Sequence, residues 1–236
     1  HIKDLGLDFG IWFEPEMVNN ESELYTNHPD WILGLPDQNL GRNQLVLDMS
    51  KSEVIDYLYN CINEILSKYE VDYVKWDHNR VLPIVDAKQT YGLYELLARL
   101  NRSYPKLEIE SCSSGGGRMD FGILDFTQRL WLSDSNDAVE RMQIQNTSAM
   151  FFPPSVIGCH VGPRKCHTTG REIDISTRAW VAAQGHLGFE FDLNELNDDE
   201  KLTLKQVAKW WKGNRYWRMD ALRYRLDMPD PALLGE

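Results

Sequence analysis

Short apolar segments alternate along this chain with amphipathic helical segments, and most of the apolar segments end in a cluster of polar residues. The clearest case is residues 71–80, whose β-prone first half runs into Lys75, Trp76, Asp77 and three further polar residues. A strand that is buried on both faces has no packing reason to end in this way. In α/β barrels, the reacting groups lie at the carboxyl ends of the strands, where side chains face a common pocket. The alternation therefore predicts a parallel α/β fold with its chemistry at the strand ends.

Six strands are predicted, at residues 7–13, 71–76, 107–112, 130–133, 155–161 and 187–192. Amphipathic helices follow most of them, and we expect capping boxes at Ser50 with Glu53 and at Asn197 with Glu200. A polar segment over residues 19–43, with Gly and Pro as breakers, is predicted to be a long functional loop. Strands that alternate with helices indicate an α/β fold with a parallel sheet. The polar strand ends favour a (β/α)8 TIM barrel that is incomplete, because six strands are two too few to close it.

The overall charge excludes several classes of partner. The chain carries a net charge of −11 and has a pI near 5.0, which argues against nucleic acid and anionic membrane as partners. No apolar run reaches the ~20 residues that a membrane span needs, and the start of the chain has no signal-peptide pattern. Four cysteines are too few for a disulfide scaffold, so we expect reduced thiols and a cytoplasmic protein.

Two aspartates end predicted strands. Asp77 and Asp134 lie two strands apart in chain order, so in a barrel their carboxylates would face the same opening. A carboxylate pair that flanks a scissile bond, one as nucleophile and one as acid/base, is what a retaining glycosidase requires. Trp12, Trp76 and Trp131 near the strand ends supply flat apolar faces for a sugar ring. The simpler alternative for the first strand is a salt bridge between Lys75 and Asp77.

Other candidate sites are weaker. The glycine run 115–117 resembles a phosphate cradle but lacks the lysine of a phosphate-binding loop, so it indicates only close backbone approach to a ligand. The Cys–His pairs at 159–160 and 166–167 have no spacing typical of a closed zinc site, and structural burial is the preferred interpretation. Glu14 and Glu16 flank a proline and are interpreted as residues that shape the loop. No metal or cofactor is predicted.

Several motifs, in this order, resemble those of the family 36 glycoside hydrolases, the bacterial α-galactosidases. They are Trp12-Phe13-Glu14-Pro15-Glu16-Met17, Gly41-Arg42-Asn43-Gln44, Lys75-Trp76-Asp77, the segment from Glu110 to Arg118, and Trp131-x-Ser133-Asp134. The resemblance extends over nearly the whole chain. It implies that the chain is most of a catalytic barrel whose first two strands are missing.

By this resemblance, Asp77 is the nucleophile and Asp134 the acid/base of a retaining α-galactosidase. The two carboxyl groups are then expected about 5–5.5 Å apart, with Lys75 nearby favouring the charged form of Asp77. The positions that match sugar-binding residues are Trp12, Arg42, Lys75, Cys112, Gly115 and Trp131. The implied partner is an α-galactoside oligosaccharide of the melibiose or raffinose type, and the parent protein is expected to form homo-oligomers.

The chain departs from the family pattern in several places. His78 stands where the family usually has methionine, and the run from Asp134 to Asp137 reads Asp-Ser-Asn-Asp where the family more often has Asp-Asn-Thr-Asp. The paired aspartates on an earlier strand, which bind the sugar's 4- and 6-hydroxyls in the family, have no counterpart here. Residues 1–236 are accordingly interpreted as a partial catalytic domain without the flanking N-terminal β-sandwich and C-terminal β-domain.

Three alternative functions stay open at this point. An α-N-acetylgalactosaminidase would need room beside residues 112–115 for an acetamido group. A carbohydrate-binding remnant without turnover would follow from the missing strands. A metal-dependent barrel hydrolase is the third alternative.

Overall fold

The computed structural model describes residues 1–35, 37–222, 224 and 226, which form two compact units divided between Leu130 and Trp131. Each unit is described by itself. None of the helices in the described part of the chain has the length and apolar character needed to cross a membrane.

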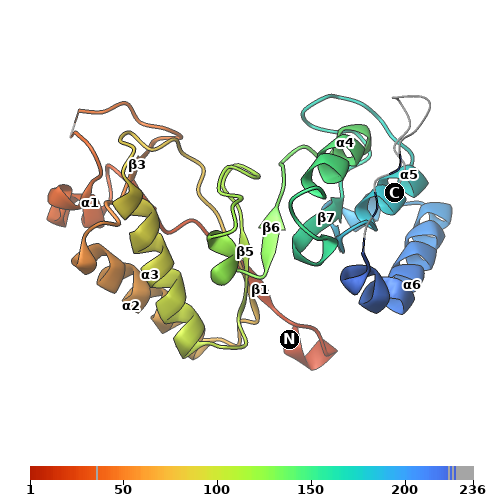
Figure 1. Cartoon of the computed structure of the whole chain (residues 1–236), viewed down its shortest axis with the longest axis horizontal. Coiled ribbons are helices and arrows are strands. Elements are labelled where there is room, and N and C mark those ends of the chain that lie inside the picture. The colour runs from red at the N-terminus through yellow and green to blue at the C-terminus, as the bar shows by residue number, and fades with distance from the viewer. Residues whose placement is uncertain (36, 223, 225, 227–236) are drawn as a thin grey trace. The chain divides into compact units, whose positions relative to one another are not determined.

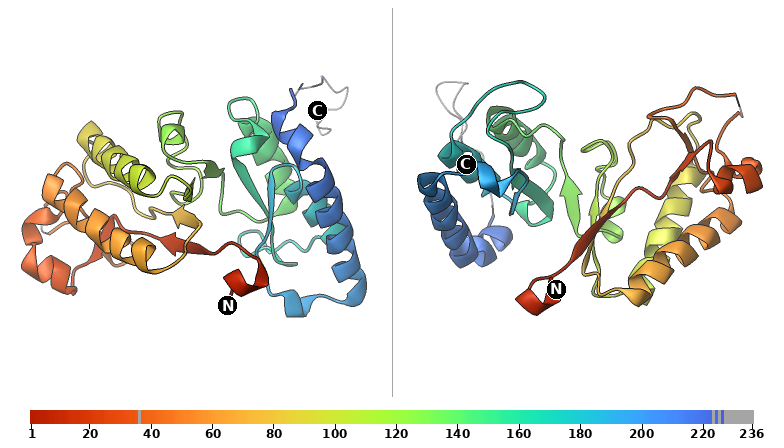
Figure 2. Two further views of the ribbon diagram at one scale, coloured as in Figure 1. Left: turned by 90° about the horizontal axis from the view of Figure 1, so that it is seen from below. Right: turned by 180° about the vertical axis from the view of Figure 1, so that it is seen from behind.

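The first unit is built on parallel strands. They are β1 (Gly10–Phe13), β4 (Tyr73–Trp76), β5 (Glu108–Ser111) and β6 (Arg129–Trp131), whose last residue begins the second unit. The strands pair in the order β1-β4-β5-β6, with β4 aligned residue for residue against β1 and β5. Two long helices, α2 (Ser52–Lys68) and α3 (Ala87–Ser103), connect these strands and pack side by side (Figures 1 and 2).

The second unit repeats the same arrangement. Its strands β7 (Ile157–Val161) and β8 (His186–Phe189) are parallel neighbours. Three helices, α4 (Ala138–Ser148), α5 (Ile175–Ala182) and α6 (Asp198–Asp220), alternate with them, and α5 packs against both α6 and β7. Among the described residues, the short 3-10 segments are η1 (Lys3–Leu5), η2 (Pro29–Trp31), η3 (Ile123–Asp125), η4 (Pro154–Val156) and η5 (Leu193–Glu195).

The predicted fold class is confirmed. All six predicted strands are present, with bounds that differ from the prediction by a few residues. Within each unit the neighbouring strands are parallel, in the pairs β1–β4, β4–β5, β5–β6 and β7–β8. The fold is α/β of the barrel type and is incomplete, with six of the eight strands of a closed barrel.

The segment predicted as one long loop contains additional structure. Strands β2 (Met17–Asn19) and β3 (Gln44–Val46) form an antiparallel pair at its base, and the short helix α1 (Glu23–Asn27) lies between them. Met17 and Val46 are buried and pack with Leu33, and Leu82 covers this small core. Three-residue strands are too short to show a period-2 pattern, which is why the sequence did not predict them.

One of the two predicted capping boxes is confirmed. The Asn197 side chain accepts from the Glu200 N–H, while the Glu200 carboxylate accepts from the Asn197 N–H. The box predicted at Ser50 is wrong, because α2 begins two residues later, at Ser52, and its cap residue makes no side-chain bond. The Ser50 hydroxyl donates to Asp48 at 2.6 Å instead, so the nearby carboxylate takes the hydroxyl that would have capped the helix.

The buried face of α2 is formed by Val54, Ile55, Leu58, Ile62 and Leu66. Tyr57 and Cys61 lie outside this face and are exposed.

Gly92 allows α3 to lie directly on the backbone of residue 49. A Cβ at Gly92 would lie 1.8 Å from the Met49 carbonyl oxygen. This oxygen belongs to the backbone, so it cannot move aside as the end of a flexible side chain could. Alanine is normally favoured over glycine in a helix by about 1 kcal/mol, but overpacking against backbone reverses the sign. We expect Gly92→Ala to lower the free energy of unfolding by about 2 kcal/mol, measured by urea denaturation.

Gly213 provides the matched control for this prediction. It lies in α6, and a Cβ there would meet nothing within 4 Å. Gly213→Ala is therefore expected to leave stability unchanged or to raise it by up to about 1 kcal/mol. A Gly92→Ala protein as stable as the original would contradict the close approach of α3 to residue 49.

Candidate active site

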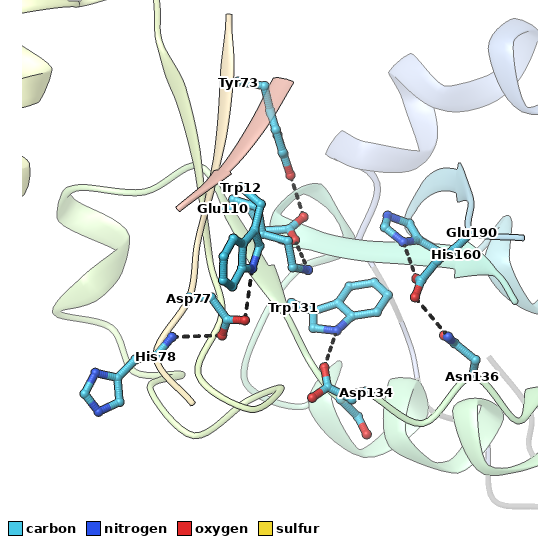
Figure 3. Close-up of polar contacts among 12 residues, drawn as sticks. Trp12, Tyr73, Asp77, His78, Glu110, Trp131, Asp134, Asn136, His160 and Glu190 are labelled. Carbon is cyan, nitrogen blue, oxygen red and sulfur yellow. Dashed lines mark hydrogen bonds and ion pairs between the residues drawn. The ribbon is translucent and has the colours of Figure 1, made fainter. Parts of the chain in front are cut away.

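Asp77 is a buried, fixed carboxylate directly after β4. Its backbone N–H donates to the Phe13 carbonyl at 2.8 Å, so the pairing of β1 with β4 continues through this residue. Its carboxylate accepts from the Trp12 indole at 3.1 Å, the Asn79 amide at 2.6 Å and the His78 N–H at 2.8 Å. Figure 3 shows the indole and the backbone N–H converging on this carboxylate.

The environment of Asp77 favours its ionised form. Burial by itself raises the pKa, but hydrogen bonds from Asn79, Cys112, Trp12 and the His78 N–H outweigh it and lower the pKa below the ordinary value. The sequence predicted an ionised Asp77 through the charge of Lys75. The structure attributes the lowered pKa to hydrogen bonds instead.

Lys75 forms an ion pair with a buried acid that sequence reasoning missed as a site residue. The ammonium lies 2.7 Å from the Glu110 carboxylate, which is only 2% exposed, and the Tyr73 hydroxyl donates to the same carboxylate at 2.5 Å (Figure 3). Lys75 and Glu110 are register partners on neighbouring parallel strands. The one indication in the sequence was an acidic residue, Glu110, inside a predicted strand. That Lys75 is its partner can be inferred only when the register of the two strands is known.

Cys112 and Gly115 lie in the tight loop that follows β5. The Cys112 thiol is buried, which raises its pKa to about 12, and it donates to Asp77 while it accepts from the Gly115 N–H. Ser114 and Gly115 adopt positive φ values of 47° and 84°, so the backbone turns back on itself and the Ser113 N–H reaches the Gly115 carbonyl. The structure thus brings Trp12, Cys112 and Gly115 together around Asp77.

Arg42 lies at an exposed turn. The backbone pairs Gly41 with Gln44, and both residues between them have positive φ values. The Arg42 side chain makes no hydrogen bond or ion pair with any residue that the structure describes. Its predicted part in sugar binding therefore stays a prediction.

In the second unit, Trp131 and Asp134 form a direct side-chain hydrogen bond. The Trp131 ring is buried, and its indole N–H donates to the Asp134 carboxylate at 2.9 Å (Figure 3). The Arg141 guanidinium lies 4.4 Å from the centre of the Trp131 ring and donates to the Ser133 carbonyl at 2.8 Å. Asp134 itself is exposed, so this indole gives an otherwise solvated carboxylate a fixed direction.

Asp137, three residues further on, is fully buried and has a structural function. Its carboxylate caps α4 by accepting from the Val139 and Glu140 N–H groups. It also accepts from Thr169 at 2.6 Å and pairs with the Arg171 guanidinium at 2.8 Å. Burial raises its pKa, but these bonds outweigh burial and lower it.

Glu16 is the central residue of a buried network that sequence reasoning missed. Its carboxylate forms a bidentate pair with Arg118 at 2.8 and 3.0 Å and accepts from the Trp76 indole at 2.9 Å. Burial alone would raise its pKa, but Arg118 and His78 outweigh this and lower the pKa to about 2. Because Arg118 ends the glycine-rich loop, Glu16 fixes that loop to the segment after β1.

Three of the four residues in the two cysteine–histidine pairs have protein partners in the described part of the chain. The buried Cys159 thiol donates to Gln145 at 3.3 Å, and Cys166 bonds to Thr168. His160 pairs with Glu190 at 2.9 Å. Across the described residues, no group of three or more His, Cys, Asp or Glu side chains is placed to hold a metal ion.

In the first unit, parallel strands that end in a fixed carboxylate, an indole and an ion-paired lysine define an α/β-barrel protein with a strand-end site. Comparison with known proteins gives the family. The family described as Melibiase matches residues 1–220, and the chain belongs to this family.

Curated relatives and solved structures agree with this assignment. An alpha-galactosidase of Escherichia coli is 44% identical over 99% of this chain and 34% of its own length. Alpha-galactosidase AgaA of Geobacillus stearothermophilus is 40% identical over 97% of this chain and 33% of its own length. The crystal structure of that GH36 enzyme matches with a TM-score of 0.90, at 38% identity over 97% of this chain and 34% of that one. The chain thus spans about a third of the length of these relatives.

Proposed function

We propose that the protein containing this chain is a retaining α-galactosidase that hydrolyses terminal α-linked galactose from oligosaccharides. The observation that carries the proposal is Asp77, a buried carboxylate held ionised by four hydrogen-bond donors at the end of a barrel strand. Family membership supports the reaction class. Structures of AgaA variants in complex with raffinose and with stachyose support α-galactoside oligosaccharides as the substrate class.

In the proposed mechanism, Asp77 attacks the anomeric carbon, while Asp134 protonates the departing glycosidic oxygen. The Asp77 carboxylate becomes the ester of a covalent galactosyl-enzyme. Asp134, now ionised, then takes a proton from water as the water attacks the anomeric carbon and releases Asp77. The Trp12 and Cys112 donors to Asp77 fix the direction of the attacking oxygen, and the Trp131 indole does the same for Asp134.

Specificity for galactose needs a donor directed at the 4-hydroxyl, the one group that separates galactose from glucose. We assign this part to Lys75, which is 25% exposed and is held by the buried Glu110. A site built to hydrogen-bond one hydroxyl rejects the sugar that lacks it in that position, because its buried polar groups are left unpaired.

Hydrolysis of three aryl glycosides by the complete protein tests this proposal. We expect kcat/KM for the α-galactoside to exceed that for the α-N-acetylgalactosaminide by at least about 100-fold, and no turnover of the β-galactoside. The sugar first released, followed by NMR, should be the α-anomer, since two inversions restore the original configuration.

Three other outcomes of this experiment would each indicate a different function. Preference for the acetamido sugar would indicate an α-N-acetylgalactosaminidase. Release of the β-anomer would indicate inversion and would require a new assignment of Asp77. Binding of galactosides without turnover would indicate a carbohydrate-binding protein.

A further inference from the structure

The Trp131–Asp134 pair is supported by a second group of side chains to which no function has been assigned so far. His160 is the fourth residue of β7, and its imidazole ring lies 4.5 Å from the Trp131 ring, tilted by 40°. Its Nδ1 donates to the Glu190 carboxylate at 2.9 Å. All of these residues belong to the second unit, and Figure 3 shows His160 and Glu190 beside Trp131.

Glu190 is itself held in place on both sides. It directly follows β8, and its backbone N–H donates to the Val161 carbonyl at 3.0 Å, which continues the pairing of the two strands. The second carboxylate oxygen accepts from the Asn136 amide at 3.2 Å. Asn136 is two residues from Asp134, so Glu190 connects the segment that carries Asp134 with the histidine that packs on Trp131.

The glycine at position 188 of β8 leaves room for the His160 ring. Gly188 is the register partner of His160, and a Cβ at Gly188 would lie 2.5 Å from the imidazole Cδ2. The ring therefore lies against bare backbone on one side and near the Trp131 indole. Any larger residue at position 188 would displace the ring from this position.

We propose that His160 is a positioning residue for Asp134, which acts through Trp131 and is oriented by Glu190. The ring contact sets the plane of the indole, and the indole N–H sets the direction of the Asp134 carboxylate. Because Asp134 is exposed, this chain of contacts keeps its carboxylate in one orientation in place of several solvated rotamers. The inference rests on the proposed function, in which Asp134 is the acid/base.

Comparing substrates with good and poor leaving groups distinguishes a positioning role of His160 from a purely structural one. Good leaving groups need little protonation, so a misdirected acid slows only the substrates with poor ones. In the complete protein, we expect His160→Ala to lower kcat/KM for raffinose by about tenfold or more and that for a nitrophenyl α-galactoside by about twofold at most. His160→Asn keeps a donor for Glu190 without the ring, and His160→Phe keeps a ring without the donor; each should show a partial form of the same pattern.

Glu190 supplies the conservative rescue and His167 the control. Glu190→Gln keeps an acceptor for His160 and should retain most raffinose turnover, whereas Glu190→Ala should match His160→Ala. His167 is exposed and makes no hydrogen bond or ion pair with the described residues, so His167→Ala should leave kcat/KM unchanged for both raffinose and the nitrophenyl α-galactoside. Equal losses on raffinose and on the nitrophenyl substrate would overturn the proposal.

A second measurement does not depend on turnover. In protein labelled with 15N-tryptophan, the indole N–H resonance of Trp131 is assigned by its loss in Trp131→Phe. His160→Ala should shift this resonance toward its position in Asp134→Ala, because the hydrogen bond to the carboxylate weakens. An unmoved resonance would overturn the positioning role of His160. If the original protein hydrolyses no galactoside, the proposed function fails and this resonance still decides the positioning.

Discussion

Replacing Asp77 by alanine is expected to lower kcat/KM for α-galactosides by roughly 10⁴-fold or more, because no other group can form the covalent intermediate. The variant also leaves the Trp12, Asn79 and Cys112 donors without their shared acceptor. Asp77→Asn is the matched variant, since it keeps the shape and one acceptor oxygen while removing the nucleophilic charge. Thermal unfolding of both variants checks that the loss is chemical and not a failure to fold.

Azide rescue assigns the two carboxylates individually. In Asp77→Ala, azide occupies the space of the nucleophile and attacks from the face opposite the leaving group, so the product is the β-galactosyl azide. In Asp134→Ala, azide replaces water in the second step, and the product is the α-galactosyl azide. The same azide anomer from both variants, or an Asp77→Ala protein with normal turnover, would refute the assignment.

Replacing Glu16 is expected to have the largest effect on stability. A carboxylate that is 1% exposed and paired with Arg118 leaves an uncompensated charge and an orphaned Trp76 N–H when it is removed. Truncating one partner of such a buried pair costs about 3–5 kcal/mol, so we expect this loss for Glu16→Ala in urea unfolding.

The pH dependence of Glu16 has a defined sign. Its pKa is about 2 in the folded protein against an ordinary 4.5, so its contribution is present above the unfolded pKa and is lost as the pH falls toward 2. The stability difference between the original protein and Glu16→Gln should therefore shrink by about 3 kcal/mol between pH 5 and pH 2. Glu64→Gln, at an exposed position of α2, is the control and should show no such change. A difference that stays constant with pH would show that Glu16 is not held ionised by its partners.

The sequence predicted those parts of the fold whose signal is local. Six strands could be located because each leaves a short apolar run in the sequence, although among them only β4 to β7 carry buried residues and β1 and β8 are partly exposed. The β2–β3 pair could not, since three residues carry no measurable period. The cap at Asn197 followed from its own motif, whereas the one expected at Ser50 failed because Asp48 competes for the hydroxyl.

The residues of the candidate site also fall into those that the sequence predicted and those that it did not. Asp77 and Asp134 were found because they end strands, a position that the sequence displays. Glu110 and Glu16 were missed as parts of the site because their partners lie 35 and 102 residues away in sequence. An acid inside a strand normally indicates a solvent-facing position, and only the register of the sheet or the folded loop shows that these two are buried.

The distance along the chain between Glu16 and Arg118 has a consequence for synthesis on the ribosome. The two residues are 102 positions apart, and at 5–20 residues per second their codons are read about 5–20 seconds apart. Trp76 follows Glu16 by 60 residues, so the indole partner is translated first, but the Glu16 carboxylate has no guanidinium to pair with until Arg118 is added. The buried network can therefore form only after the glycine-rich loop has been synthesised, and a ribosome that stalls before residue 118 leaves a chain that cannot complete it.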